Sequence, residues 1–181
     1  MNNQRSHHTA TLLMNGKVLV TGGRTDQSIT VAYAELYNPL TGTWTATSNM
    51  NDHRSEHTAS VLPDGRVLVA GGQQDNYAKF TAEIYDPSTE TWKTISNMND
   101  RRCRHTATVL PDGKVLVAGG YLGSSLNSVE LYDPLSDTWS ILDSLNIARS
   151  KHTATLLTNG KILIAGGESN SAPFPVVTEL Y

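Results

Sequence analysis

The stretch His57-Thr-Ala-Ser-Val-Leu-Pro-Asp-Gly-Arg-Val-Leu-Val-Ala-Gly-Gly72 decides the fold, because related versions of it occur four times in the 181 residues. The copies are marked by His8, His57, His105 and His152, which follow one another at intervals of 49, 48 and 47 residues. A period this long is typical of repeat architectures, in which each unit buries its apolar faces by stacking on its neighbours. We therefore expect the shared residues to form the scaffold and the differing residues to carry the function.

Each copy predicts four short β-strands. Two apolar runs flank Asp64-Gly65, and an Asp-Gly or Asn-Gly pair at this point predicts a two-residue hairpin turn. The second run, Val67-Leu-Val69, is apolar at consecutive positions, which indicates a strand covered on both faces. A third strand ends at Tyr85, Asp86-Pro87 opens a turn, and a fourth strand starts at Trp92. Four antiparallel strands in about 45–50 residues indicate a propeller blade rather than a helical solenoid.

A glycine pair ends the second strand of every copy, at Gly22-Gly23, Gly71-Gly72, Gly119-Gly120 and Gly166-Gly167. Such pairs indicate special dihedral angles or a backbone approach too close for a side chain. A tyrosine follows 13–15 residues after the first glycine of each pair, and in three copies a tryptophan stands seven residues beyond that tyrosine. This combination resembles the kelch repeat over nearly the whole chain. The resemblance implies an all-β propeller of four-stranded blades. Members of that family mostly act as interaction platforms, and a minority are enzymes such as the galactose-oxidase-like copper oxidases.

The copies predict approximate blades at residues 5–53, 54–101, 102–148 and 149–181, the last of them incomplete. Tyr181 stands where the other copies continue into a turn and a tryptophan strand, so we expect three complete blades, three strands of a fourth, and about 15 strands. Kelch propellers usually close with six or seven blades, which favours a fragment of a larger propeller. A tight four-bladed ring lacking one strand and closure by association of two copies remain alternatives. The open ends predict self-association.

Composition narrows the range of partners. A net charge of -3 and an isoelectric point near 6.0 lack the basic footprint that nucleic acid requires, so we expect no nucleic-acid partner. The longest apolar runs, such as 161–165, are too short for a membrane span, and we expect no membrane partner. The sequence shows no signal peptide and no glycosylation sequon, and its single cysteine, Cys103, cannot form an internal disulfide. These features favour a cytoplasmic location over a secreted one.

The repeated polar and aromatic residues are expected to be structural. Four equivalent histidines could suggest a metal site, but equivalent positions around a propeller lie too far apart for ligand distances of about 2 Å. We therefore predict histidines that are hydrogen-bonded to the backbone, with no metal and no cofactor. The repeated Arg and Glu residues predict one ion pair per blade, and the repeated Tyr and Trp residues predict packing between blades. These residues are Arg5, Arg54, Arg102, Arg149, Glu35, Glu83, Glu130, Glu179, Tyr37, Tyr85, Tyr132, Tyr181, Trp44, Trp92 and Trp139.

No motif in the sequence predicts catalysis. The Gly-x-Ser-x-Gly nucleophile motif and the Gly-rich phosphate loop are absent. Copper-radical oxidases of the kelch superfamily need a Cys–Tyr pair that can cross-link, and no tyrosine is distinguished as a partner of Cys103. We therefore predict that the chain is not an enzyme.

The topology of a blade predicts where the segments that differ between the copies lie in the fold. In a four-stranded antiparallel blade, the second loop and the link to the next blade lie at one end, opposite the first and third turns. The variable segments 24–33, 73–81, 121–128 and 168–177 are the second loops, and loops on a rigid scaffold commonly bind partners. The candidate partner-binding residues are Arg24, Asp26, Gln73, Gln74, Asp75, Asn76, Tyr77, Tyr121, Glu168 and Asn170.

These features predict a non-catalytic protein–protein interaction module. An alternative is the non-catalytic portion of a galactose-oxidase-like or glycan-directed kelch enzyme. A purely structural repeat without a partner is a third reading.

Overall fold

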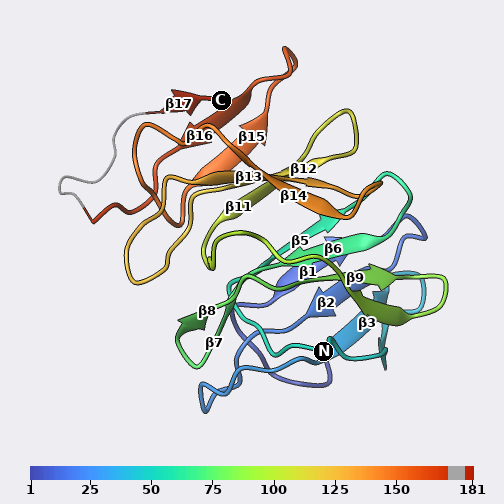
Figure 1. Ribbon diagram of the computed structural model, residues 1–181. Helices are drawn as coiled ribbons and strands as arrows, with labels where there is room; N and C mark the ends of the chain where they lie inside the picture. Colours follow the sequence, from blue (N-terminus) through green and yellow to red (C-terminus); the bar gives the residue numbers. More distant parts are fainter. Residues whose placement is uncertain (171–177) are drawn as a thin grey trace.

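The computed structural model describes residues 1–170 and 178–181, and the strands in this part of the chain form four consecutive antiparallel sheets (Figure 1). Blade 1 contains β1 (Thr9–Leu12), β2 (Val18–Thr21), β3 (Ala34–Asn38) and β4 (Thr43–Ala46). Blade 2 contains β5 (Thr58–Val61), β6 (Val67–Ala70), β9 (Ala82–Asp86) and β10 (Thr91–Thr94). Blade 3 contains β11 (Thr106–Val109), β12 (Val115–Ala118), β13 (Val129–Asp133) and β14 (Thr138–Leu142). Blade 4 contains β15 (Thr153–Leu156), β16 (Ile162–Ala165) and β17 (Glu179–Leu180).

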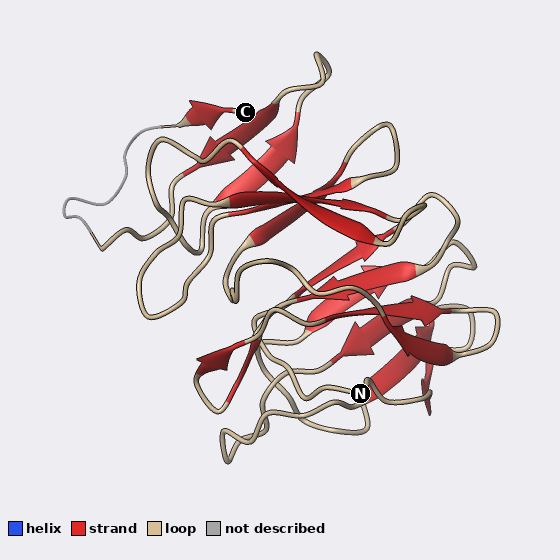
Figure 2. Cartoon of the chain, viewed as in Figure 1, coloured by secondary structure: helices blue, strands red, loops and turns tan. Residues whose placement is uncertain are grey.

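This architecture confirms the predicted kelch-type blades (Figure 2). Three blades have four strands each, and the fourth blade has three described strands. The described part of the chain adds one element that the repeat does not predict, a small hairpin of β7 (Gln73–Gln74) and β8 (Tyr77–Ala78). No helix among the described residues has the length and apolar character needed to span a membrane.

The four blades follow one another in chain order around an inner row of first strands. β5 contacts β1 on one side and β11 on the other, and β11 contacts β15. Figure 1 shows the same progression from the blue blade 1 to the red blade 4. β1 and β15 share no contact of comparable extent. The structure is therefore an open arc of blades.

The first turn of each blade differs from the two-residue hairpin that the sequence predicts. In blade 2, Leu62 still pairs with Arg66, because the Leu62 N–H donates to the Arg66 carbonyl at 2.8 Å. Three residues therefore form the loop, and Gly65 alone has a positive φ, +88°. The Asp64 side chain accepts the Arg66 N–H at 3.1 Å. This arrangement is a type I turn followed by a left-handed glycine, so the two-residue turn is wrong at this position.

The core lies between the blades. One face of each sheet packs against the opposite face of the next, which makes three apolar clusters, one at each junction. β6 and β12 are buried along their whole length, as the consecutive apolar residues predict. β16 of blade 4 alternates between buried and half-buried residues, because none of the described blades covers its outer face. Burial in this fold therefore depends on the presence of a neighbouring blade.

The glycine pairs confirm the predicted close approach of backbone segments. Gly71 and Gly72 have φ values of +60° and +91°. A Cβ atom on Gly71 would lie 2.5 Å from the carbonyl oxygen of Arg102 in the next blade. The Gly72 N–H donates to that same oxygen at 2.9 Å. A side chain at Gly71 would therefore push blades 2 and 3 apart.

Each Arg–Glu pair lies within one blade and anchors the link that leads into it. In blade 3 the Arg102 guanidinium donates to the Glu130 carboxylate at 2.8 Å, with both side chains buried. The same carboxylate accepts the backbone N–H groups of Asn99 and Asp100, at 2.6 and 3.0 Å. Equivalent pairs occur in the other blades, at 2.5–2.8 Å. These residues are scaffold, as predicted.

The tyrosines and tryptophans pack at the junctions, but to different depths. Tyr85 is completely buried and Trp92 is half-buried, and their ring centroids lie 5.0 Å apart. The Trp92 indole N–H donates to the carbonyl of Ser48, in the link from blade 1, at 2.8 Å. Trp139 makes the same bond to Ser96, at 3.0 Å.

Replacing Trp92 with alanine is expected to lower the free energy of unfolding by about 2 kcal/mol, below the 3–5 kcal/mol typical of fully buried aromatic residues. The half-buried ring removes less apolar surface, and the Ser48 carbonyl can be solvated. Urea denaturation measures the loss. Trp44→Ala is the matched control, because none of the described blades packs against the outer face of blade 1, and its loss should be smaller. Equal losses for the two variants would contradict a role for Trp92 at the junction.

Candidate functional site

The variable loops and the starts of the blades lie at the same end of the molecule, as the topology predicts. The first residue of each loop forms an antiparallel bridge with the residue that follows the blade's first arginine, as Gln73 does with Ser55. The β7–β8 hairpin projects from this end, at the left of Figure 1, and the tight turns lie on the opposite side. We call the first end the variable face and the second the turn face.

Four residues form an inner rim on the variable face, one immediately before each repeated histidine: His7, Glu56, Arg104 and Lys151. All four have left-handed backbone conformations, with φ of 54–56°. The Glu56 N–H donates to the His7 carbonyl at 3.0 Å, Arg104 to Glu56 at 3.1 Å, and Lys151 to Arg104 at 2.9 Å. Four different side chains are therefore held on one repeated, hydrogen-bonded backbone.

Three of the four rim side chains, those of Glu56, Arg104 and Lys151, are charged and paired. Arg104 donates to the Glu56 carboxylate at 2.6 Å across the junction of blades 2 and 3. Lys151 pairs with Glu168, the first residue of its own blade's variable loop, at 2.9 Å. The rim residues and the repeated histidines line an open hollow of about 580 Å³. A polar, charged depression therefore lies among the variable loops.

The loops of blades 1 and 2 touch each other. Arg24 donates to the Ser55 hydroxyl at 3.0 Å and to the Asn76 side-chain oxygen at 3.4 Å. Asp75 and Asn76, with φ of 50° and 68°, form the tip of the β7–β8 hairpin. Tyr77 follows the tip and is 80% exposed. The hairpin therefore presents an aromatic side chain to solvent on a defined backbone.

The other candidate residues divide between exposed and supporting positions. Asp26 is exposed, and its carboxylate accepts the N–H of Gln27 at 2.9 Å. Gln74 is half-buried. Gln73 is buried, and its amide donates to the Glu56 carboxylate. Gln73 thus positions a rim residue from beneath.

In blades 3 and 4 the candidate residues contact the rim or a neighbouring loop. The Arg104 guanidinium lies 5.5 Å from the centre of the Tyr121 ring. The Asn170 side-chain oxygen accepts the N–H and the hydroxyl of Ser125, at 3.0 and 3.1 Å, which connects the loops of the two blades. The remaining part of the last predicted loop, residues 171–177, lies outside the described residues.

The rim was missed as a candidate site, although a signal for it exists in the sequence. In the four copies Arg-Ser/Cys-x-His-Thr-Ala-Thr/Ser, the third position changes from His to Glu to Arg to Lys, while its neighbours stay nearly constant. A variable position inside a repeated motif indicates a side chain that the scaffold does not constrain. The four rim residues occupy this variable third position of the motif.

The repeated histidines are bound differently from the prediction. His57, His105 and His152 place Nε2 at 2.9–3.0 Å from the hydroxyls of Thr9, Thr58 and Thr106 in the preceding blades, instead of bonding to the backbone. The Nδ1 atoms of these three rings are buried without a hydrogen-bond partner. Burial first, and then the neighbouring arginine, lowers the pKa of His57 to about 3 and that of His152 to about 4. These rings are neutral structural groups at pH 7.

The Cys103 thiol is also far from its reactive form. Burial, and then the charge of Glu56, raises the pKa of the Cys103 thiol to about 11, so it is not a thiolate at neutral pH. Within the described residues, no three His, Cys, Asp or Glu side chains gather in a way that could hold a metal ion.

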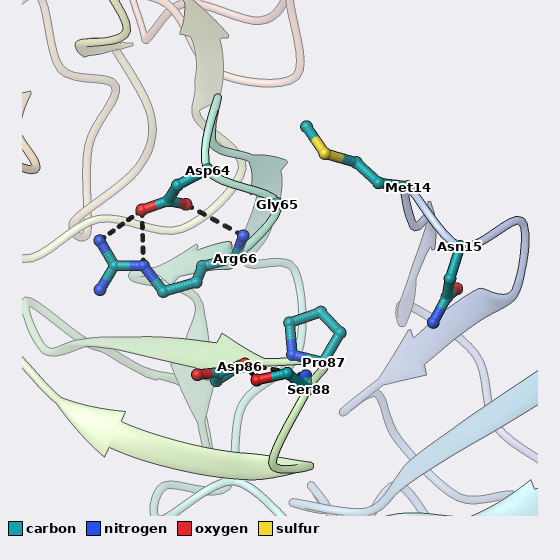
Figure 3. Close-up of a pocket in the computed structure, with 8 residues that line it drawn as sticks. All are labelled: Met14, Asn15, Asp64, Gly65, Arg66, Asp86, Pro87 and Ser88. Atoms are coloured by element: carbon teal, nitrogen blue, oxygen red, sulfur yellow. Dashed lines mark hydrogen bonds and ion pairs between the residues drawn. The ribbon is translucent and has the colours of Figure 1, made fainter.

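The turn face carries a hollow of about 470 Å³ between the turns of blades 1 and 2 (Figure 3). Asp64 and Arg66 pair with each other on one side of it, at 2.6 Å, and Met14 lies on the neighbouring turn. Asp86 and Pro87 belong to the turn that the first three copies share. This hollow is lined largely by scaffold residues.

Four-stranded antiparallel blades, glycine pairs at the junctions and a buried Arg–Glu pair in each blade define a kelch-type β-propeller. The chain belongs to the kelch-repeat family, since the model of the KLHDC2/KLHL20/DRC7 Kelch-repeats domain matches residues 1–172. Domains of this family are generally protein-interaction modules and are typically non-enzymatic. Comparison with curated proteins gives no match.

Proposed function

We propose that this chain is a non-catalytic module that binds a protein partner through its variable face. The contact would combine the inner rim with the loop residues around it, including Tyr77 and Tyr121. Tyrosines supply large contact areas at a low cost in side-chain entropy, and charged rim residues supply specificity. The propeller blades would hold both sets in place.

One observation carries this proposal. The rim positions have the same φ and the same hydrogen bonds in successive blades, and yet their side chains are His7, Glu56, Arg104 and Lys151. The backbone geometry does not account for four different side chains, because the scaffold holds each of them alike. Side chains that vary on a rigid frame are what a binding surface requires, and those of His7 and Lys151 are the more exposed of the four.

The selection of peptides from a random library on the 181-residue chain tests the proposal. We expect a double replacement of Tyr77 and Tyr121 by alanine to weaken the selected peptides at least about tenfold, the effect of losing roughly 1.4 kcal/mol. The matched control replaces Leu40 and Leu135, which are 95% and 96% exposed in the third turns of blades 1 and 3 on the turn face. Their replacement by alanine should leave binding unchanged. Peptides that depend on the leucines instead would place the binding surface on the turn face.

A further inference from the structure

A second hollow on the variable face, of about 280 Å³, lies beside the β7–β8 hairpin and shares no lining residue with the hollow of the inner rim. The hairpin and the residue after it supply most of its wall, and the link from blade 2 to blade 3 supplies the rest. We call it the hairpin hollow. Its lining residues are Gln74, Asp75, Tyr77, Ala78, Lys79 and Arg101.

Arg101 is an exposed arginine whose donors are almost unused. Its Nη1 group donates to the Ala78 carbonyl at 3.5 Å, and it forms no ion pair with any of the described residues. An arginine has five N–H donors, so most of them remain available. Arg24 also lacks an ion pair, but it donates to the side chains of Ser55 and Asn76. The arginines that form ion pairs are Arg5, Arg54, Arg66, Arg102, Arg104 and Arg149.

An aromatic ring supports the Arg101 guanidinium. Its central carbon lies 4.4 Å from the centre of the Phe80 ring, and Phe80 packs against the apolar cluster between blades 2 and 3. An arginine stacked on an aromatic ring can still donate from its edge to a carboxylate. A side chain that is already held in this way loses less conformational freedom when a ligand binds.

The repeat does not require an arginine at this position. The equivalent residues before the first arginine of the other blades are Gln4, His53 and Ala148. The β7–β8 hairpin is likewise particular to blade 2 among the described elements. Both parts of the wall therefore come from features that differ between the copies.

The remaining side chains set the charge of the hairpin hollow. Lys79 Nζ already pairs with Asp52, at 3.2 Å. Asp75, at the exposed tip of the hairpin, forms no ion pair within the described part of the chain. An anion in the hollow would be attracted by Arg101 and repelled by Asp75, so the two residues give opposite tests. Tyr77, which is 80% exposed, adds aromatic surface to the same wall.

We propose that the hairpin hollow binds an aspartate or glutamate side chain of a protein partner, with Arg101 donating two parallel N–H groups to its carboxylate. Paired donation from a guanidinium to a carboxylate is both strong and geometrically specific. The apolar part of the bound segment would lie against Tyr77. This inference rests on the proposed function and names the chemistry that the partner presents at this edge of the variable face.

A nuclear magnetic resonance titration of the 181-residue chain with N-acetylglutamic acid α-amide, whose only charge is the side-chain carboxylate, tests the proposal. The Arg101 Nε–H resonance should shift and saturate, and the neutral N-acetylglutamine α-amide should leave it unchanged. Arg66, which is partly exposed and already paired with Asp64, is the matched control and should not shift. No shift at Arg101, or an equal shift with the glutamine compound, would overturn the proposal. Tighter binding of inorganic phosphate at Arg101 would overturn the assignment to a carboxylate.

Two variants at exposed positions test the charges, with binding followed at the Tyr77 backbone N–H. Arg101→Gln introduces the residue type of Gln4 in blade 1 and should raise the dissociation constant of N-acetylglutamic acid α-amide at least about tenfold. Asp75→Asn should lower that constant about threefold, and asparagine tolerates the left-handed conformation of this residue. Unchanged binding by Arg101→Gln, or weaker binding by Asp75→Asn, would contradict the proposed role of the hollow.

The titration uses no selected peptide, so its result is read separately from the test of the proposed function. A peptide library without any binder would contradict the proposed function, whereas the saturable Arg101 shift would still support a carboxylate site. Selected peptides that bind while the Arg101 resonance stays unchanged in the titration would contradict the carboxylate site alone.

Discussion

Replacing Arg102 with methionine is expected to lower the free energy of unfolding by about 3–5 kcal/mol, the usual cost of breaking a buried ion pair. The Arg102 side chain is completely buried and donates to the Glu130 carboxylate and to the carbonyls of Gly119 and Ser128, at 2.7–3.0 Å. Methionine has a similar length but leaves the carboxylate charge and both carbonyls without these donors. The Glu130 carboxylate, which holds the link into blade 3, would lose the group that neutralises its charge.

Urea denaturation measures this loss of stability, and two further variants serve as comparisons. Arg66→Met breaks an ion pair with Asp64 in which both side chains are partly exposed, so its loss should stay below about 1 kcal/mol. Combining Arg102→Met with Glu130→Gln should recover part of the stability, because the uncompensated charge is removed. A loss below about 1 kcal/mol for Arg102→Met alone would show that the pair does not hold the blade together.

Acidification below pH 6.5 is expected to destabilise the chain steeply. Burial lowers the pKa of His57 to about 3, that of His152 to about 4, and that of His105 well below its usual value. In the unfolded chain the same groups bind a proton near pH 6.5. The unfolded state therefore binds more protons, and stability falls by about 1.4 kcal/mol per pH unit for each histidine. Three histidines give about 4 kcal/mol per unit between pH 6 and 5.

The sign of the effect follows from the lowered pKa values. Stability is fully present above pH 6.5 and is lost as the pH falls toward the pKa of the folded state. Urea unfolding at pH 7.5, 6.5, 5.5 and 5.0 measures the slope. His57→Gln should reduce that slope by about one proton and leave the region above pH 6.5 flat. An unchanged slope in this variant would show that the folded chain protonates His57 readily.

Much of the fold can be predicted from the sequence, because the chain repeats one set of short-range signals four times. The strand order within a blade follows from turn residues such as Asp64-Gly65 and Asp86-Pro87, and the buried second strand follows from Val67–Val69. The geometry of the first turn could not be predicted in this way, because Asp-Gly fits both a two-residue turn and a three-residue loop. The Leu62–Arg66 pair decides between them.

The site could be predicted only in part, because its residues come from different blades. The variable loops follow from topology, whereas the contact of Arg104 with Glu56, 48 positions away in the sequence, depends on how the blades stack. Within blade 2, the Gln73 amide donates to the same Glu56 carboxylate from 17 positions away. The histidine–threonine bonds cross between blades as well, which explains why a local backbone partner was the wrong expectation.

We propose that the variable positions of the four copies form one face that binds a protein partner. Photo-cross-linking in cells that express the chain tests it most directly. A photoreactive amino acid replaces Tyr77, Tyr121 or Lys151 on the variable face, or Leu40, Ser88 or Leu135 on the turn face. We predict a discrete covalent adduct with a partner protein from the first three positions and none from the last three. Adducts only from the turn face, or from none of the six positions, would show that the variable face does not bind the partner.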